Sequence, residues 1–385
     1  MSKWEWKKLK DICEKGSSNI KQSDLKDLTG DYPIFGASGY IQNVDFYQRD
    51  RDYIGIIKDG SGVGRTMLLP AFSSVIGTLQ YILPKEGNDI KFINYALQNI
   101  DFSKSIQGAA IPHIYFKDYG ETEIFVPPLS EQKRIVKFLD EEFSKIDTLK
   151  TNAETNLKNA KELFETTLEK ELNPLSRHSE RSEESRADLP SGWEWKILGD
   201  VCEKISDGSH NPPKGTAANE YKMLSSKNIF NDSLNFDDPR FLTKEEFDLE
   251  NKRTNVKKGD ILLTIVGTIG RCCVFLEDEP VVFQRSVAVL KPNVSLVYSR
   301  FLMYGIIALN IEKLGRGAAQ KGVYLKQLSN ISIPLPPLSV QKEIVARLDK
   351  LSENVKRLEA NYKQIIANCD ELKKTILKKT FEGES

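Results

Sequence analysis

The sequence lacks the features that mark secreted and membrane proteins. No run approaches the roughly 20 apolar residues that a membrane-spanning helix needs, and the opening Met1-Ser2-Lys3-Trp4 has no apolar signal region. The five cysteines form no CxxC pair, which argues against both a disulfide framework and a zinc site. We therefore expect a cytoplasmic protein. Its 385 residues, 39% of them hydrophobic, suffice for about two to three packed domains.

A net charge is also absent, because 55 Lys and Arg side chains balance 55 Asp and Glu side chains. Simple nucleic-acid binders usually carry a basic excess. Any nucleic-acid surface on this chain must therefore arise from sorting charges to one face, or from positive charge that a partner supplies.

Motifs of catalysis are missing as well. The glycine-rich stretch 59–65 lacks the Gly-Lys-[Ser/Thr] of a phosphate-binding loop, so we interpret it as a tight turn between strands. Residues 211–214 read Asn-Pro-Pro-Lys, whereas adenine methyltransferases need an aromatic ring in the last place to stack on the flipped base. The three histidines, His113, His178 and His210, are too far apart in sequence to suggest a metal site. We expect no enzymatic activity, no metal and no cofactor of the chain's own.

What the chain does contain is a repeat of itself. Residues 4–15 return as 193–204 with nine of twelve positions identical, and residues 127–136 return as 336–345. A duplicated unit this long is no solenoid repeat, whose period would be roughly 20–50 residues. Two such units imply an internal pseudo-two-fold, as a homodimer would have.

Between the repeated blocks, short apolar runs alternate with Gly, Asp and Asn turns, which is typical of strands. We therefore predict a mixed α/β domain in each half. The predicted strands are 53–57, 75–83, 261–266, 281–283 and 287–290, and the predicted helices are 92–99 and 298–311.

A long helix is predicted after each Pro-Pro-Leu-Ser, because Ser is a good N-cap and about forty residues without proline follow. Apolar residues then alternate at spacings of four and three, the pattern of a coiled coil. Small residues of one helix match large ones of the other, and with the pseudo-two-fold this favours an antiparallel pair. The predicted seam consists of Ile135, Leu139, Ile146, Leu149, Ile344, Leu348, Leu351, Val355, Leu358, Ile365 and Leu372.

The predicted fold is therefore α+β, with two mixed domains separated by two long antiparallel coiled-coil helices. A segment rich in Ser, Glu and Arg joins the halves and is interpreted as a solvated linker. The expected boundaries are 1–128 for the first domain, 129–172 for the central helix, 173–190 for the linker, 191–337 for the second domain and 338–382 for the C-terminal helix.

Taken together, the Trp-Glu-Trp opening and the Pro-Pro-Leu-Ser-x-Gln-Lys-x-Ile-Val entry into each helix resemble the DNA-specificity (S) subunit of Type I restriction–modification systems. In both halves a Gly-Ala-Ala, at 108–110 and 317–319, precedes a matched Tyr-x-Lys. The resemblance implies two target-recognition domains, each binding half of a bipartite double-stranded DNA target. The helices would fix the spacer and dock two methyltransferase (M) subunits, with two restriction (R) subunits where the system cleaves DNA. S-adenosylmethionine, ATP and Mg would be bound by these partners.

On this hypothesis the two domains read successive major-groove faces about one helical turn, or 10 bp, apart. Arginine can bridge guanine O6 and N7 or hold a phosphate, and the other polar side chains can contact base edges. Surface ion pairing and ordinary loop polarity remain alternatives for these residues. The candidate DNA-binding residues are Lys58, Arg65, Gln107, His113, Lys117, His210, Lys214, Arg271, Gln320, Lys321 and Lys326.

One further class of function fits the same pattern. A coiled-coil scaffold whose two domains bind proteins would explain the neutral charge directly. A steep loss of DNA affinity with salt would separate the two hypotheses, because phosphate contacts release counterions.

Overall fold

A computed structural model describes residues 4–108, 111–172, 189–315 and 321–382. The chain divides into two compact units. Unit 1 comprises Met1–Asn156 and Asn361–Ser385, and unit 2 comprises Leu157–Ala360. Each unit therefore combines one mixed domain with a part of both long helices. No helix in the described part of the chain has the length and apolarity to cross a membrane.

Domain 1, the part of unit 1 before the first long helix, is built on a four-stranded antiparallel sheet of order β2-β8-β5-β6. A three-stranded sheet, β4-β3-β7, and the pair β1-β9 complete it. Every residue of the central strand β5 is buried. The elements are β1 (Glu5–Lys8), α1 (Leu9–Ile12), β2 (Cys13–Ser17), η1 (Gln22–Leu25), β3 (Tyr32–Gly36), β4 (Gly39–Val44), β5 (Tyr53–Ile57), β6 (Thr66–Leu69), β7 (Ser74–Val75), β8 (Leu79–Pro84), α2 (Ile90–Gln98), η2 (Phe102–Ser105), α3 (Phe116–Tyr119) and β9 (Glu123–Val126).

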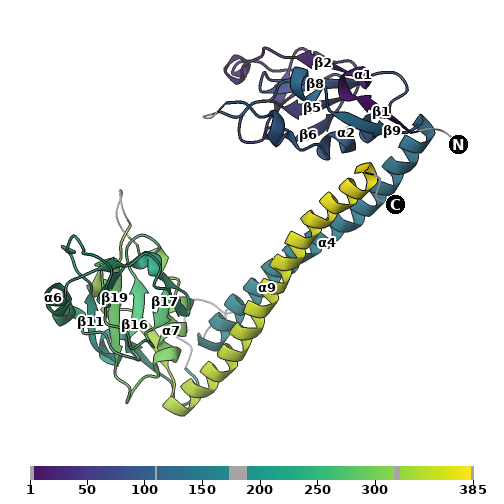
Figure 1. The fold of residues 1–385 in the computed structure, drawn as a ribbon. Helices are drawn as coiled ribbons and strands as arrows, with labels where there is room; N and C mark the ends of the chain where they lie inside the picture. Colours follow the sequence, from purple (N-terminus) through teal and green to yellow (C-terminus); the bar gives the residue numbers. More distant parts are fainter. Residues whose placement is uncertain (1–3, 109–110, 173–188, 316–320, 383–385) are drawn as a thin grey trace. The chain divides into compact units, whose positions relative to one another are not determined.

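Domain 2, the part of unit 2 from residue 189 to the second long helix, has the same plan. Its four-stranded sheet has the order β11-β19-β16-β17, as Figure 1 shows, and β15-β12-β18 is the three-stranded sheet. The elements are β10 (Glu194–Ile197), α5 (Leu198–Val201), β11 (Cys202–Asp207), β12 (Lys222–Leu224), η4 (Ser226–Asn228), β13 (Ile229–Phe230), β14 (Ser233–Leu234), β15 (Arg240–Phe241), α6 (Lys244–Thr254), β16 (Ile261–Thr264), β17 (Cys272–Val274), β18 (Val281–Phe283), β19 (Val287–Pro292), α7 (Ser299–Ala308), η5 (Ile311–Leu314), α8 (Leu325–Ser329) and β20 (Ser332–Leu335).

The two domains differ by two additions. Between β12 and β15, domain 2 inserts the hairpin β13-β14, and after β15 it inserts the helix α6. Within the described residues of domain 1, β3 runs directly into its partner β4. The two domains thus share one arrangement of sheets but differ in the segments that connect the strands.

Most predicted elements are confirmed, with one correction in each domain. The predicted strand 75–83 is two strands, because β7 pairs with β3 in one sheet and β8 pairs with β2 and β5 in the other. The predicted helix 298–311 ends at Ala308, and a separate 3-10 turn follows from Ile311.

The two long helices have the predicted bounds, α4 at Leu129–Leu172 and α9 at Leu338–Glu382. Inside each unit they run antiparallel. In unit 1, Lys150 pairs with Asp370 at 2.7 Å and Asp147 pairs with Lys373 at 2.5 Å. In unit 2, α4 and α9 segments share one buried core, to which α4 contributes Leu168 and Leu172 and α9 contributes Ile344, Val345 and Leu348.

Of the eleven predicted seam residues, six are buried, one is half-buried and four are exposed. Buried are Ile135, Leu139, Ile146, Ile344, Leu348 and Val355, and Leu351 is half-buried. Exposed to between 38% and 56% are Leu149, Leu358, Ile365 and Leu372. In both helices the inward position lies one residue later, at Lys150, Ile366 and Lys373. The apolar stems of the two lysines cover the seam while their ammonium groups reach carboxylates of the facing helix. A hydropathy pattern scores such lysines as exposed, which explains the error.

Candidate nucleic-acid interface

Two loops of domain 1 bring most of its predicted DNA-binding residues together. The turn after β5 and the segment before α3 are joined by backbone hydrogen bonds from Ile114 N to Lys58 O (3.0 Å) and from Gly60 N to Pro112 O (2.9 Å). Gln107 and His113 exchange both of their backbone hydrogen bonds, at 2.8 and 2.9 Å. Lys58, Gln107 and His113 therefore lie in one loop cluster.

The side chains of this cluster offer donors, acceptors and an aromatic face. Gln107 Nε2 donates to Asp118 at 3.0 Å, and the ring of His113 lies 5.0 Å from that of Tyr115. The ammonium of Lys117 lies 5.4 Å from the Tyr115 ring. Tyr115, the tyrosine of the matched Tyr-x-Lys, is 43% exposed and was not among the predicted DNA-binding residues. A mobile cation beside an exposed ring suits contacts to phosphates and bases.

The stretch 59–65 is the predicted turn between strands. Gly64 N donates to Ile57 O and Ile57 N to Arg65 O, both at 2.9 Å, so the turn returns directly into β6. Gly64 has a φ of +87° and Phe102 lies against it, so a side chain here would be both strained and crowded. Among the described residues the side chain of Arg65 donates one long hydrogen bond of 3.4 Å, to the carbonyl of Ala37.

Domain 2 repeats this arrangement. Val323 N donates to Ile265 O at 2.9 Å, which joins the turn after β16 to the segment before α8. Arg271 closes that turn, and its guanidinium lies 5.1 Å from the Phe230 ring. In the described part of the chain neither Arg65 nor Arg271 pairs with a carboxylate. Lys321 and Lys326 are exposed beside the same turn, whereas Gln320, Ala109, Ala110 and residues 317–319 lie outside the described residues.

His210 and Lys214 occupy a different edge of domain 2. His210 Nε2 lies 2.7 Å from the carboxylate of Asp207, which also binds Arg253 of α6. Burial alone would raise the pKa of Asp207, but the hydrogen bonds from Arg253 and His210 outweigh it and lower that pKa. Lys214 follows Pro213, whose carbonyl accepts a hydrogen bond from Arg240.

The turn between β18 and β19 connects these two edges. Arg285 N donates to Ser209 O at 2.8 Å, and Ile265 N donates to the carbonyl of the next residue, Ser286, at 2.9 Å. Arg285 is exposed between the His210 segment and the Arg271 turn. Arg285 was not among the residues predicted from the sequence, because its place depends on these hydrogen bonds to distant segments.

Among the described residues, no group of three His, Cys, Asp or Glu side chains is close enough to hold a metal ion. Buried Cys13 and Cys202 are free, and burial raises the pKa of each thiol to about 12. A thiol of this pKa stays protonated at neutral pH and packs as a small apolar group.

Comparison with known families decides the identity. The chain matches the family model "Type I restriction modification DNA specificity domain" over residues 1–159 and again over 190–367. The chain belongs to the Type I restriction–modification DNA specificity family. As a specificity subunit it carries one such domain in each half, so the resemblance noted in the sequence is confirmed.

Its relatives are similar along much or all of the chain. The specificity subunit of the Type I restriction enzyme EcoBI of Escherichia coli is 26% identical over 71% of this chain, which spans 60% of that relative's length. The MjaVIII specificity subunit of Methanocaldococcus jannaschii is 24% identical over 99% of this chain and 92% of its own.

Two solved structures share the fold. The HsdS subunit from Thermoanaerobacter tengcongensis is 22% identical, with a TM-score of 0.56 over 99% of this chain and 97% of that one. A chain from a study of complex assembly and conformational transition of the type I R-M system is 20% identical, with a TM-score of 0.72 over 98% and 97%.

Proposed function

We propose that this specificity subunit reads an interrupted double-stranded DNA sequence, with each domain contacting one half. The observation that carries the proposal is the repeated loop pair, Lys58 to Arg65 with Gln107 to Lys117 in domain 1 and Ile265 to Arg271 with Lys321 to Lys326 in domain 2. Equivalent turns of one frame present different side chains, which is what reading two different half-sequences requires. Phosphate contacts would position each domain, and base-edge contacts would specify the target.

In this proposal α4 and α9 form an antiparallel coiled-coil strut related by a pseudo-two-fold, and its length sets the spacer. The antiparallel contacts found inside each unit support it. Two methyltransferase subunits would dock on the helices, where exposed apolar side chains offer a binding surface. These are Leu149 and Leu163 on α4 and Leu358, Ile365 and Leu372 on α9.

Chemistry would belong to the partners. S-adenosylmethionine would be bound by the methyltransferase subunits, and ATP and Mg by restriction subunits where they exist, while this chain supplies recognition alone. A scaffold whose domains bind only proteins is not favoured, because the family match in both halves is to a DNA specificity domain.

Exchange of domains tests the proposal. Replacing residues 16–107 with the corresponding segment of another specificity subunit should change only one half of the methylated sequence and leave the other half and the spacer intact. Methylation mapping in the host measures this. The matched exchange in domain 2 should change only the other half, and a change of both halves by either exchange would contradict the proposal.

A further inference from the structure

Each domain is attached to its helix by the same pair of polar anchors. The first is a buried glutamine, Gln132 or Gln341. Its Oε1 accepts a hydrogen bond from the backbone N–H of Asp89 (2.7 Å) or Tyr298 (2.8 Å), at the start of α2 or α7. Its Nε2 donates to a carbonyl of the Pro-Pro pair, at 2.9 Å in unit 1 and 2.8 Å in unit 2.

The second anchor lies two turns further along the helix. In unit 1, Asp140 accepts hydrogen bonds from Lys91 (2.7 Å) and Tyr95 (2.6 Å) of α2. In unit 2, Asp349 accepts them from Arg300 (2.6 Å) and Tyr304 (2.7 Å) of α7. The spacing of these residues is the same in both copies, so the attachment itself is duplicated.

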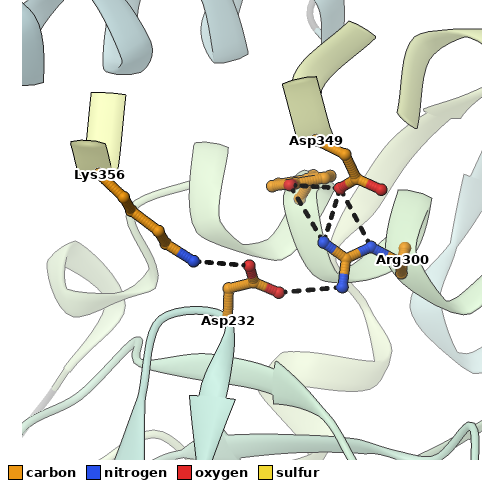
Figure 2. A network of polar contacts seen from close by, with 5 residues as sticks. Asp232, Arg300, Asp349 and Lys356 are labelled. Carbon is orange, nitrogen blue, oxygen red and sulfur yellow. Dashed lines mark hydrogen bonds and ion pairs between the residues drawn. The ribbon is translucent and has the colours of Figure 1, made fainter. Parts of the chain in front are cut away.

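Unit 2 adds a third anchor that comes from the hairpin peculiar to domain 2. Figure 2 shows Asp232 between Arg300 and Lys356, with one carboxylate oxygen 3.0 Å from the Arg300 guanidinium and the other 3.0 Å from the Lys356 ammonium. Asp232 sits in the β13-β14 turn at a φ of +59°, and its N–H donates to the Cys272 carbonyl at 2.9 Å. The carboxylate is 19% exposed and the Arg300 side chain 25%, so solvent screens this contact less than the contact to Lys356, whose side chain is 60% exposed.

Unit 1 has no counterpart of this anchor among its described residues. The position that matches Lys356 is Asp147, which pairs with Lys373 of α9 instead of with domain 1. Asp140 is the last residue of α4 that receives a hydrogen bond from the described part of domain 1. Beside it lies an open groove of about 530 Å³, lined by Tyr95, Asp140 and Asp147 among others.

We propose that Asp232 is a positioning residue that locks domain 2 to α9 at a third point, so that the angle between domain 2 and its helix is held more tightly than the angle between domain 1 and its helix, where the described residues supply only the two shared anchors. Asp349 and Lys356 are seven residues apart, about 10 Å along the helix. A contact this far beyond Asp349 resists rotation of domain 2 about the two anchors that both units share. The tolerance of the complex for altered spacers would then be set in domain 1, while domain 2 supplies the fixed reference.

This inference rests on the proposed strut function, and one substitution tests it cleanly. Asp232→Asn keeps the shape of the side chain and tolerates the left-handed backbone, but removes the charge. Asp238→Asn is the matched control, because Asp238 also has a positive φ (45°) in domain 2 yet pairs only with exposed Lys227. Lys356→Met should reproduce the effect of Asp232→Asn, and Lys356→Arg should preserve the wild-type behaviour.

The first readout is methylation by the complex with its methyltransferase subunits, on DNA with the native spacer and with one base pair added or removed. Asp232→Asn should lower the preference for the native spacer by about three- to fivefold, within the range that such ion pairs contribute. The bases read in each half should not change. A preference unchanged from wild type and from Asp238→Asn would overturn the inference. A wild-type complex indifferent to the spacer would instead overturn the strut function.

The second readout needs no DNA. Spin labels at Val294→Cys and Arg357→Cys report the distance from domain 2 to α9, and labels at Lys85→Cys and Thr148→Cys report the matched distance in unit 1. All five native cysteines are buried. The distance distribution should be narrower in unit 2 than in unit 1, and Asp232→Asn should widen it. Equal widths in both units, or no widening, would refute the lock whatever the DNA assay gives.

Discussion

Asp140 and Asp349 illustrate how a single carboxylate can fix a domain. Each lies on a long helix and receives hydrogen bonds from two side chains of one helix of its domain. Burial alone would raise the pKa of Asp140, but the hydrogen bonds from Lys91 and Tyr95 outweigh it and hold that pKa below its ordinary value. In both units the bound tyrosine has a raised pKa, mainly through burial and also through the carboxylate beside it. Each tyrosine therefore stays a hydrogen-bond donor at neutral pH.

The lowered pKa of Asp140 predicts an acid-sensitive attachment. Because the folded-state pKa lies below the unfolded value of about 3.9, the stabilisation is present above that value and is lost as pH falls through the folded pKa. Asp140→Asn should lower the melting temperature of the protein at pH 7 and flatten its decline below about pH 4. Thermal unfolding followed by circular dichroism at a series of pH values measures this. Glu141→Gln, which removes only an exposed ion pair of 3.9 Å with Lys137, should leave the profile unchanged; if both variants behave alike, Asp140 is not an anchor.

At the scale of the helix, a comparison of the adjacent residues Ile365 and Ile366 shows which face of α9 is packed. Ile366 is half-buried and Ile365 is 40% exposed. Ile366→Ala should lower the free energy of unfolding by about 1–2 kcal/mol, and Ile365→Ala by less than about 0.5 kcal/mol. Urea denaturation of both variants measures the difference.

Ile365→Ala should have its effect elsewhere. On the proposed function it removes part of the apolar surface on which a methyltransferase subunit docks, so it should weaken that complex while leaving the free subunit stable. If Ile365→Ala destabilises the free subunit more than Ile366→Ala, the corrected seam is wrong.

The sequence was sufficient for the bounds of both long helices, because proline, an N-capping serine and unbroken periodicity are local signals. It was insufficient to predict which residues of the two helices face each other. Lys150 and Lys373 pack through their apolar stems, while their ammonium groups pair with carboxylates more than 200 residues away in the sequence. The same limit applied to the site. Lys58 and His113 stood out by their place in repeated loops, whereas Arg285 gains its place only from the pairing of β18 and β19 with distant segments. Asp232 gave no signal, since its partners lie on two helices far along the chain.

For the whole molecule, the proposed DNA binding is compatible with a balanced net charge, because basic side chains gather at the loop pairs. Lys58, Arg65 and Lys117 gather around the loop pair of domain 1, and Arg271, Lys321 and Lys326 around that of domain 2. The acidic side chains along α4 and α9 include Asp140, Asp147 and Asp370, which pair with lysines or hold a domain.

DNA binding by the assembled complex should therefore fall steeply with salt, even though this chain has no net charge. Lys117→Ala should reduce the slope of log affinity against log salt by about 1 if Lys117 contacts a phosphate, with the same loss on cognate and unrelated DNA. Fluorescence anisotropy across a salt series measures it. Lys145→Ala, on α4 and paired with Glu142, is the control; a slope unaffected by Lys117→Ala would remove this lysine from the interface.

The core of unit 1 has a consequence for how the protein is made. Phe92 of domain 1 packs at 5.3 Å against Phe381 in the last turn of α9, and Leu377 joins the same core. Domain 1 therefore emerges from the ribosome early, but the α9 residues that complete its core are synthesised only after domain 2 has emerged. A premature stop codon before Leu377 would accordingly destabilise the half of the protein that was translated first.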